Sequence, residues 1–177
     1  MATSTLRAET AKVVRLADGD LSRLWRLVSQ GASAEVALRD MLPAIIREYG
    51  ALGATLAAEW YDDQRQKVGA KGRFSAIPIE ADDRGAQALV GWALATATND
   101  TSLATLVLGG MQRRIADHVR LTIAGSSVAD PVAHGWVRVG AGECDWCQQY
   151  LDGEVRAVAY DFPAHDNCRC SAIPAWR

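Results

Sequence analysis

Hydrophobic residues recur three and four positions apart through most of the first 130 residues of the chain. This spacing places them on one face of a helix, whereas strict alternation would indicate a strand. Charged residues fall mainly on the other faces, so each helix is predicted to bury one stripe. The predicted helical segments are residues 5–30, a long segment through 45–60, residues 84–97 and residues 102–124.

Polar residues and glycines predict where the first helices begin and end. Asp18-Gly19-Asp20 is predicted to break the first segment, with Asp20 as the N-cap of its second half. Gly31 is expected to end that half, and Ser33 can cap the next segment. Pro43 suits the first turn of a helix, so the long helix is predicted to restart there.

The later helices have boundary residues of the same kind. Asp82 or Asp83 can cap the helix that starts near Arg84, and residues 99–102 combine a stop with a new cap. Gly109-Gly110 lies inside the last helix and costs about 1 kcal/mol per glycine relative to alanine. We therefore expect either a bend or the close approach of another backbone at this point.

The long helix is predicted to pack through a stripe of large side chains. The predicted stripe consists of Ile45, Ile46, Tyr49, Leu52, Leu56 and Trp60.

A loop is predicted after the long helix, over residues 69–78. This segment contains two glycines, two cations and a proline, and a short extended piece is expected around Ile77 to Ile79.

The pattern changes near residue 130. Residues 135–139 alternate at shorter spacing and predict a strand that leads into a cysteine-containing region. We therefore predict two parts, a helical body over residues 1–130 and a small module over residues 131–177. The predicted fold class is mainly α with a small C-terminal α+β zinc-knuckle lobe.

Composition and charge narrow the classes of function. The 177 residues are 49% apolar, which is enough to bury a core, and the formal net charge is −2. Residues 1–133 have 15 basic and 15 acidic side chains and residues 134–177 have 4 and 6, so neither part has a charge bias that recruits a polyanion. Broad electrostatic binding of DNA is therefore disfavoured.

The chain has no predicted membrane segment or export signal. Its longest uncharged stretch, residues 85–99, is too short to span a bilayer, and its first ten residues lack the features of a secretory signal. A reducing cytoplasm is then the expected compartment, where closely spaced cysteines are more often metal ligands than disulfides.

Every cysteine of the chain and one of its three histidines fall within 27 positions near the C-terminus. Cysteine and histidine pairs at short spacing are typical of tetrahedral zinc sites, which take four ligands. Bound zinc would stabilise a lobe whose own core, Trp146, Tyr150, Tyr160 and Phe162, is small. The five candidate ligands are Cys144, Cys147, His165, Cys168 and Cys170.

Two ligand sets are open because five donors compete for four positions. The first is Cys144, Cys147, His165 and Cys168, favoured because His165-x-x-Cys168 mirrors the spacing of Cys144 and Cys147. The second consists of the four cysteines, with His165 as a supporting hydrogen-bond partner. Disulfides, a redox pair and free core cysteines are weaker interpretations of the same residues.

Candidate catalytic residues are lacking. His118 is interpreted as a core or surface residue of a helix, and His134 as a polar turn residue beside the predicted strand. The acidic pairs Asp62-Asp63 and Asp82-Asp83 fit a solvated face and a helix cap. No phosphate-binding loop, dinucleotide fingerprint or nucleophile elbow occurs, so we expect a protein that is not an enzyme.

Four segments of the C-terminal part resemble a known family. Residues 135–139 (GWVRV), 144–147 (CDWC), 152–153 (DG) and 164–170 (AHDNCRC) together resemble the minor head proteins of tailed phages typified by the F protein of phage Mu, the MuF-like family. Asp166 stands where that family commonly has proline, a version similar to those of phages of actinobacteria. The specific resemblance covers about 40 residues, and the helical part resembles such proteins only generally.

The resemblance implies a low-copy minor capsid protein that acts in head morphogenesis. Such a protein would lie in the virion, in the capsid interior near the portal, after assembly in the bacterial cytoplasm. The implied partners are the portal protein and the major capsid or scaffold proteins, with possible contact to packaged DNA and none to membrane. Its alternatives are an HNH-like endonuclease, a zinc-ribbon nucleic-acid-binding protein and a head-maturation protease.

Overall fold

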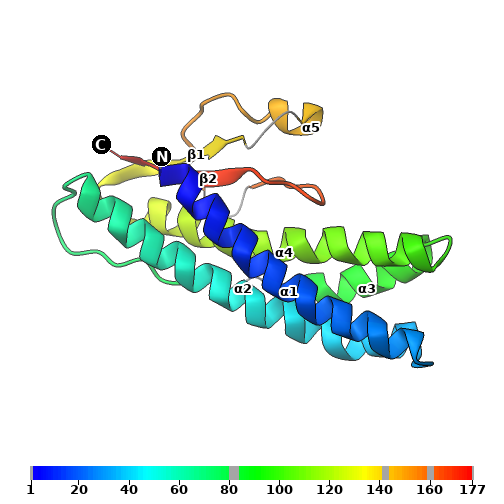
Figure 1. The fold of residues 1–177 in the computed structure, drawn as a ribbon. Coiled ribbons are helices and arrows are strands. Elements are labelled where there is room, and N and C mark those ends of the chain that lie inside the picture. The colour runs from blue at the N-terminus through cyan, green and yellow to red at the C-terminus, as the bar shows by residue number, and fades with distance from the viewer. Residues whose placement is uncertain (1, 80–83, 141–143, 159–161, 177) are drawn as a thin grey trace.

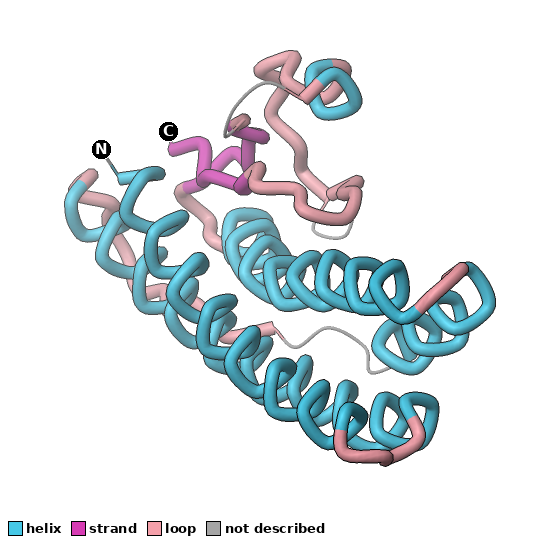
Figure 2. The backbone as a smooth tube through the Cα atoms, turned by 45° about the vertical axis from the view of Figure 1, so that its right-hand side comes forward, coloured by secondary structure: helices cyan, strands magenta, loops and turns pink. Residues whose placement is uncertain are grey.

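The fold consists of four long helices and a small C-terminal lobe, in a computed structural model that describes residues 2–79, 84–140, 144–158 and 162–176. The lobe lies above the helices and its sheet rests against the end of α4 (Figure 1). The start of α1 and the end of β2 lie side by side in Figures 1 and 2. The elements in chain order are α1 (Ala2–Ser29), α2 (Ala34–Lys67), α3 (Arg84–Thr96), α4 (Asp100–Ala129), β1 (Ala133–Val139), α5 (Asp145–Gln148) and β2 (Ser171–Trp176).

The fold class expected from the sequence is confirmed, since the chain is mostly helical and ends in a small sheet beside the Cys/His cluster. Helices α2 and α4 pack along each other, with α1 across α2 and α3 beside both. The two strands pair antiparallel, and Trp136 lies opposite Pro174 and Arg138 opposite Ala172.

Three of the predicted helix boundaries are confirmed. Gly31 ends α1 with φ 103°, a left-handed conformation that glycine adopts without a steric cost. The hydroxyl of Ser33 accepts a hydrogen bond from the Val36 N–H at the start of α2. Asn99 caps α4 in a reciprocal capping box with Ser102. The predicted caps Asp82 and Asp83 lie outside the described residues.

Two predicted boundaries in the first two helices are wrong. Helix α1 runs without a break through residues 18–20. Residues before and after this segment, such as Ala17 and Leu21, are buried in the core between the helices and keep the chain helical. Asp20 accepts a hydrogen bond from the Tyr49 hydroxyl at 2.7 Å instead of capping a helix. Pro43 lies inside α2, which begins nine residues earlier and continues because Leu42 and Ile45 are buried around it.

The core side of α2 is formed by small residues as well as by the predicted large stripe. Gly50, Gly53, Ala54, Ala57 and Ala58 are buried there, whereas Leu52 of the predicted stripe is 41% exposed. Small residues let α4 approach closely, and a Cβ on Gly50 would lie 2.4 Å from Nε2 of His118.

The glycine pair of α4 allows a close approach of neighbouring segments. A Cβ on Gly109 would lie 3.2 Å from Nδ2 of Asn167, and a Cβ on Gly110 would lie 2.3 Å from Cδ1 of Leu89. The close partners are thus side chains of the C-terminal segment and of α3. Residues 69–78 form the expected loop, which contains no strand within its described residues, and Thr122 of α4 accepts a hydrogen bond from the Ile79 N–H.

The lobe and the helices share one cluster of buried hydrophobic residues. Trp136 and Ala172 of the sheet pack in it with Tyr61 of α2 and Ile123 of α4. A second cluster fills the centre of the helices, and a third is formed by Cys147, Ala164, Cys168 and Cys170. The cysteine region is therefore joined to the helices through the sheet.

Candidate metal centre

Two tight turns place the first four candidate ligands. Helix α5 begins directly after Cys144, and the N–H groups of Cys147 and Gln148 both donate to the Cys144 carbonyl. On the other segment, the Cys168 N–H donates to the His165 carbonyl at 3.1 Å. Asn167 closes this turn in the left-handed region, with φ 63°, which asparagine tolerates better than most residues. Each x-x spacing thus forms one turn, as the sequence predicted.

The donor atoms converge at distances close to those around a single ion. Nε2 of His165 lies 3.1 Å from Sγ of Cys144 and 3.2 Å from Sγ of Cys147. Sγ of Cys147 lies 3.8 Å from Sγ of Cys168. Neighbouring ligands of tetrahedral zinc are about 3.5–3.8 Å apart, given zinc–sulfur bonds of about 2.3 Å and zinc–nitrogen bonds of about 2.0 Å. The cluster can therefore hold a metal ion such as zinc.

Cys147 is the common member of two overlapping donor groups. One group is Cys144, Cys147 and His165, and the other is Cys147, Cys168 and Cys170, with the ligand atoms of each group within 4.8 Å of one another. All four cysteines are free thiols, and Cys147, Cys168 and Cys170 are buried. Each ligand set considered from the sequence thus contains one group of three converging donors.

The ring of His165 is oriented for metal binding. Its Nδ1 lies 2.6 Å from the carbonyl oxygen of Asp166, which can only accept a hydrogen bond. The proton is therefore on Nδ1, and the lone pair of Nε2 points toward the thiols. A backbone carbonyl that fixes the tautomer in this way is typical of metal-binding histidines. Trp146 packs its ring at 82° to the imidazole and holds it from one side.

A buried arginine faces the sulfur atoms, and the sequence alone did not predict this role. Arg138 is 5% exposed, and its Nη2 lies 3.5 Å from Sγ of Cys147 and 3.6 Å from Sγ of Cys168. Its Nη1 donates to the Pro163 carbonyl, and its guanidinium stacks 4.4 Å from the centre of the Phe162 ring.

Arg138 has no carboxylate partner in the part of the chain that the structure describes. A buried cation is stable only beside compensating negative charge. The thiol groups can supply that charge once they are ionised, as they are when they bind a metal ion. Alternation in the GWVRV segment was the signal for this role, because it puts Arg138 on the same face as the buried Trp136.

A second buried arginine attaches the cysteine segment to α4. Arg120 donates from Nε to the Cys170 carbonyl and from Nη2 to the Cys168 carbonyl, at 3.1 and 2.6 Å. Its Nη1 forms an ion pair with Asp117 at 2.6 Å. This arginine fixes the backbone on both sides of residue 169 against the helix.

The thiols of Cys147 and Cys168 have their pKa values shifted in opposite directions. Burial, together with hydrogen bonds to the neighbouring thiols, raises the pKa of the Cys147 thiol to about 12. Burial also acts to raise the pKa of Cys168, but the Arg120 and Arg138 guanidinium groups and the Cys170 backbone outweigh it, so this pKa lies below the usual value. Cys168 is therefore the more readily ionised of the two.

The other two histidines lie apart from the donor groups. His118 is buried on α4 against Gly50, as expected of a core histidine, and His134 is exposed on β1. Neither belongs to a metal-binding group among the described residues.

The remaining residues of the C-terminal motifs hold the lobe together. Trp136 exchanges two backbone hydrogen bonds with Arg156, and its Nε1 donates to the Val158 carbonyl. Its ring stacks on Phe162 at 5.4 Å. Arg156 also forms an ion pair with Asp152 across the turn at Gly153. Of the predicted small core, Trp146 packs against Tyr150 but is 39% exposed, and Phe162 packs against the buried cysteines. The fourth member, Tyr160, lies outside the described residues.

Replacing Gly135 with alanine is expected to destabilise the lobe by about 2–4 kcal/mol, because the change combines strain with a backbone clash. Gly135 has φ 133°, and a Cβ there would lie 2.2 Å from the Arg156 carbonyl oxygen. The matched control is Gly153→Ala, at φ 73° with open space around it, for which only about 1 kcal/mol is expected. Urea unfolding of the two variants measures both losses of stability. Equal losses would contradict the expected clash between a side chain at residue 135 and the Arg156 carbonyl.

No helix in the described part of the chain is long and apolar enough to span a membrane. No curated protein and no solved structure matches the chain. The model of one protein family, described as VG15 protein, matches residues 1–177. Because the match extends over the whole sequence, the chain belongs to the VG15 protein family.

Proposed function

We propose that this chain is a MuF-like minor capsid protein of a tailed phage, a non-enzymatic component of head morphogenesis. One observation supports this proposal most directly. The four segments that carry the sequence resemblance are linked by contacts: Arg138 of the first reaches the sulfur atoms of Cys147 in the second and Cys168 in the last. Asp152 of the third segment pairs with Arg156, which exchanges two backbone hydrogen bonds with Trp136 of the first. The residues that carry the resemblance therefore contact one another in three dimensions, and these contacts include residues other than the cysteines.

The metal in this proposal is zinc, and its role is structural. Thiolate and imidazole ligands suit zinc, and four protein ligands leave no open position for a substrate or an activated water. The favoured set is Cys144, Cys147, His165 and Cys168, and Cys170 replaces His165 in the alternative set. In either set the ion would join α5 to the segment that leads into β2, and so hold the lobe closed.

The proposed location is the capsid interior near the portal, and the proposed partners are the portal, major capsid or scaffold proteins. Packaged DNA is a possible further contact. The net charge of −2 favours protein partners over a polyanion as the main contact.

The test is to isolate procapsids and mature heads from the phage that encodes this chain and to quantify the polypeptide by mass spectrometry. We expect the polypeptide to be present at low copy number in these particles, with cross-links to the portal or to shell proteins. A chain with Cys147→Ser, produced in its place, is the control for dependence on the folded lobe. Particles that lack the polypeptide at every stage of assembly would refute the proposal.

A further inference from the structure

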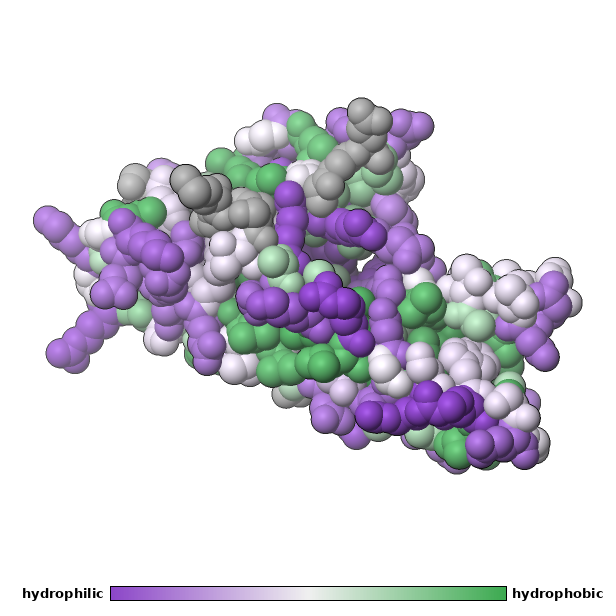
Figure 3. All heavy atoms as spheres, in the orientation of Figure 1, coloured by the Kyte–Doolittle hydropathy of each residue, from purple (hydrophilic) through white to green (hydrophobic). Residues whose placement is uncertain are grey.

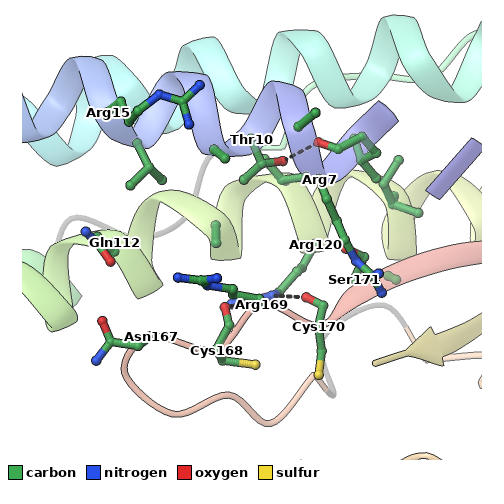
Figure 4. A pocket seen from close by; sticks show the side chains of 18 of the residues that line it. Arg7, Thr10, Arg15, Gln112, Arg120, Asn167, Cys168, Arg169, Cys170 and Ser171 are labelled. Atoms are coloured by element: carbon green, nitrogen blue, oxygen red, sulfur yellow. Dashed lines mark hydrogen bonds between the residues drawn. The ribbon is translucent and has the colours of Figure 1, made fainter. Parts of the chain in front are cut away.

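A cavity of about 690 Å³ lies between α1, α4 and residues 167–172. The surface in Figure 3 is hollowed between the lobe and the helices, and hydrophilic side chains border the hollow. Figure 4 shows the cavity from close by, with Arg7 and Arg15 on α1 and Arg169 on the C-terminal segment. The volume is within the range of ligand-binding sites, about 300–1,000 Å³.

The lining of the cavity has a positive charge that the rest of the chain does not have. It includes four arginines and a single carboxylate, whereas the whole chain has a net charge of −2. The carboxylate, Asp18, accepts hydrogen bonds from Gln112. Burial raises the pKa of Asp18 above its usual value. The four arginines are Arg7, Arg15, Arg120 and Arg169.

Two of these arginines are fixed by the protein and two are available to a ligand. Arg7 donates to the Val139 and Gly140 carbonyls, and Arg120 holds the cysteine segment. Arg15 and Arg169 are exposed, and neither has a carboxylate partner within the residues that the structure describes. The buried Nε of Arg7 also has no hydrogen-bond partner there. The cavity thus presents unused donors for an anionic group.

The walls between the arginines are apolar. Leu6, Val14, Val119 and Ile123 are among the side chains that line them, and no aromatic residue belongs to the described lining. Single-stranded nucleic acids are usually bound on aromatic side chains on which the bases stack, and the cavity lacks such a platform. A peptide with alternating apolar and acidic side chains matches this surface, because its apolar side chains fit the apolar walls and its carboxylates fit the arginines.

We propose that the cavity binds an acidic peptide segment of a partner protein, with carboxylates on Arg15 and Arg169 and apolar side chains against Val14 and Val119. Arginine suits this role because its planar guanidinium pairs with a carboxylate through two hydrogen bonds. The inference rests on the cavity and its charges and does not depend on the proposed role in the phage head.

The experiment measures binding of a dye-labelled 12-residue peptide of glutamate and leucine to the purified full-length chain by fluorescence anisotropy. We expect saturable binding that weakens with salt, since exposed charge pairs are screened. The double variant R15E/R169E is expected to bind about tenfold more weakly. The matched control is K71E/R73E, which makes the same change in net charge on exposed residues outside the cavity lining and is expected to change affinity less than about twofold.

Three results would overturn the inference. The first is an absence of binding at about 1 mM peptide, which is weaker than a specific site should show. The second is equal binding of the same peptide with glutamine in place of glutamate, or tighter binding of a 12-nucleotide oligothymidine. The third is equal weakening in the two double variants, which would reveal a general charge effect. Circular dichroism of each variant establishes that the helices are intact.

Discussion

Replacing Cys147 with serine is expected to abolish stoichiometric zinc binding, whichever fourth ligand the site uses. Cys147 is the only donor shared by the two groups of converging ligand atoms, so its loss leaves neither group with three ligands. Structural zinc contributes about 10–16 kcal/mol of apparent binding free energy in small folded units. Much of the stability of residues 134–177 should therefore disappear with the ion.

Elemental analysis of the purified protein measures the first part of this result. The wild-type chain should contain about one equivalent of zinc and the Cys147→Ser variant almost none. Hydrogen exchange measures the second part, and protection should fall more over residues 134–177 than over α2 and α4. Because Trp136 and Tyr61 share a hydrophobic cluster, a smaller loss is also expected at the near ends of those helices.

Parallel variants identify the fourth ligand. If His165 is a ligand, Cys170→Ser should retain a full equivalent of zinc, whereas His165→Ala should lose it. The opposite result would assign the four cysteines. Less than about half an equivalent in the wild-type chain, together with four freely titrating thiols, would contradict a structural zinc site altogether.

Local features of the structure could be predicted from the sequence because their causes are local. Gly31, Ser33 and Asn99 satisfy backbone groups a few residues away, so their types and positions are informative by themselves. The donor pairs around Cys147 and His165 were predictable for the same reason, because each pair forms within one turn.

Features that depend on distant segments could not be predicted in this way. The continuity of α2 through Pro43 depends on the burial of Leu42 and Ile45 by other helices, which outweighs the proline penalty. Arg120 looks like one more polar residue of a helix, and only the fold brings the Cys168 and Cys170 carbonyls to it. A pattern of residues along one segment does not contain such partners.

The largest expected effect in the helical part follows from Asp130, at the junction of α4 and β1. Its carboxylate is 0% exposed and accepts hydrogen bonds from Nε of Arg65, at 2.8 Å, and from the hydroxyl of Tyr61, at 3.2 Å. The other oxygen accepts from the Val132 N–H. Arg65 is almost as deeply buried and also donates to three carbonyls of residues 70–72. One carboxylate thus connects α2, the following loop and the start of the lobe.

Replacing Asp130 with alanine should lower the free energy of unfolding by about 3–5 kcal/mol, because it leaves the Arg65 charge buried without its partner. The pair is not expected to be worth this much in itself, since both charges had to be removed from water to form it. Exchanging both residues for apolar ones, as in Asp130→Leu with Arg65→Met, should therefore cost less than Asp130→Ala alone. Urea unfolding followed by circular dichroism measures all three proteins.

The control is Asp63→Ala on α2, the helix that also carries Arg65. It removes the carboxylate of an exposed ion pair with Lys67 and should change the free energy of unfolding by less than about 0.5 kcal/mol. A loss for Asp130→Ala as small as that of the control would mean that water reaches Arg65 and screens it. A double variant less stable than Asp130→Ala would mean that loss of the hydrogen bonds from Arg65 to the carbonyls of residues 70–72 costs more than burial of Arg65 without a carboxylate partner. The comparison thus separates the energy of the ion pair from the cost of an uncompensated buried charge.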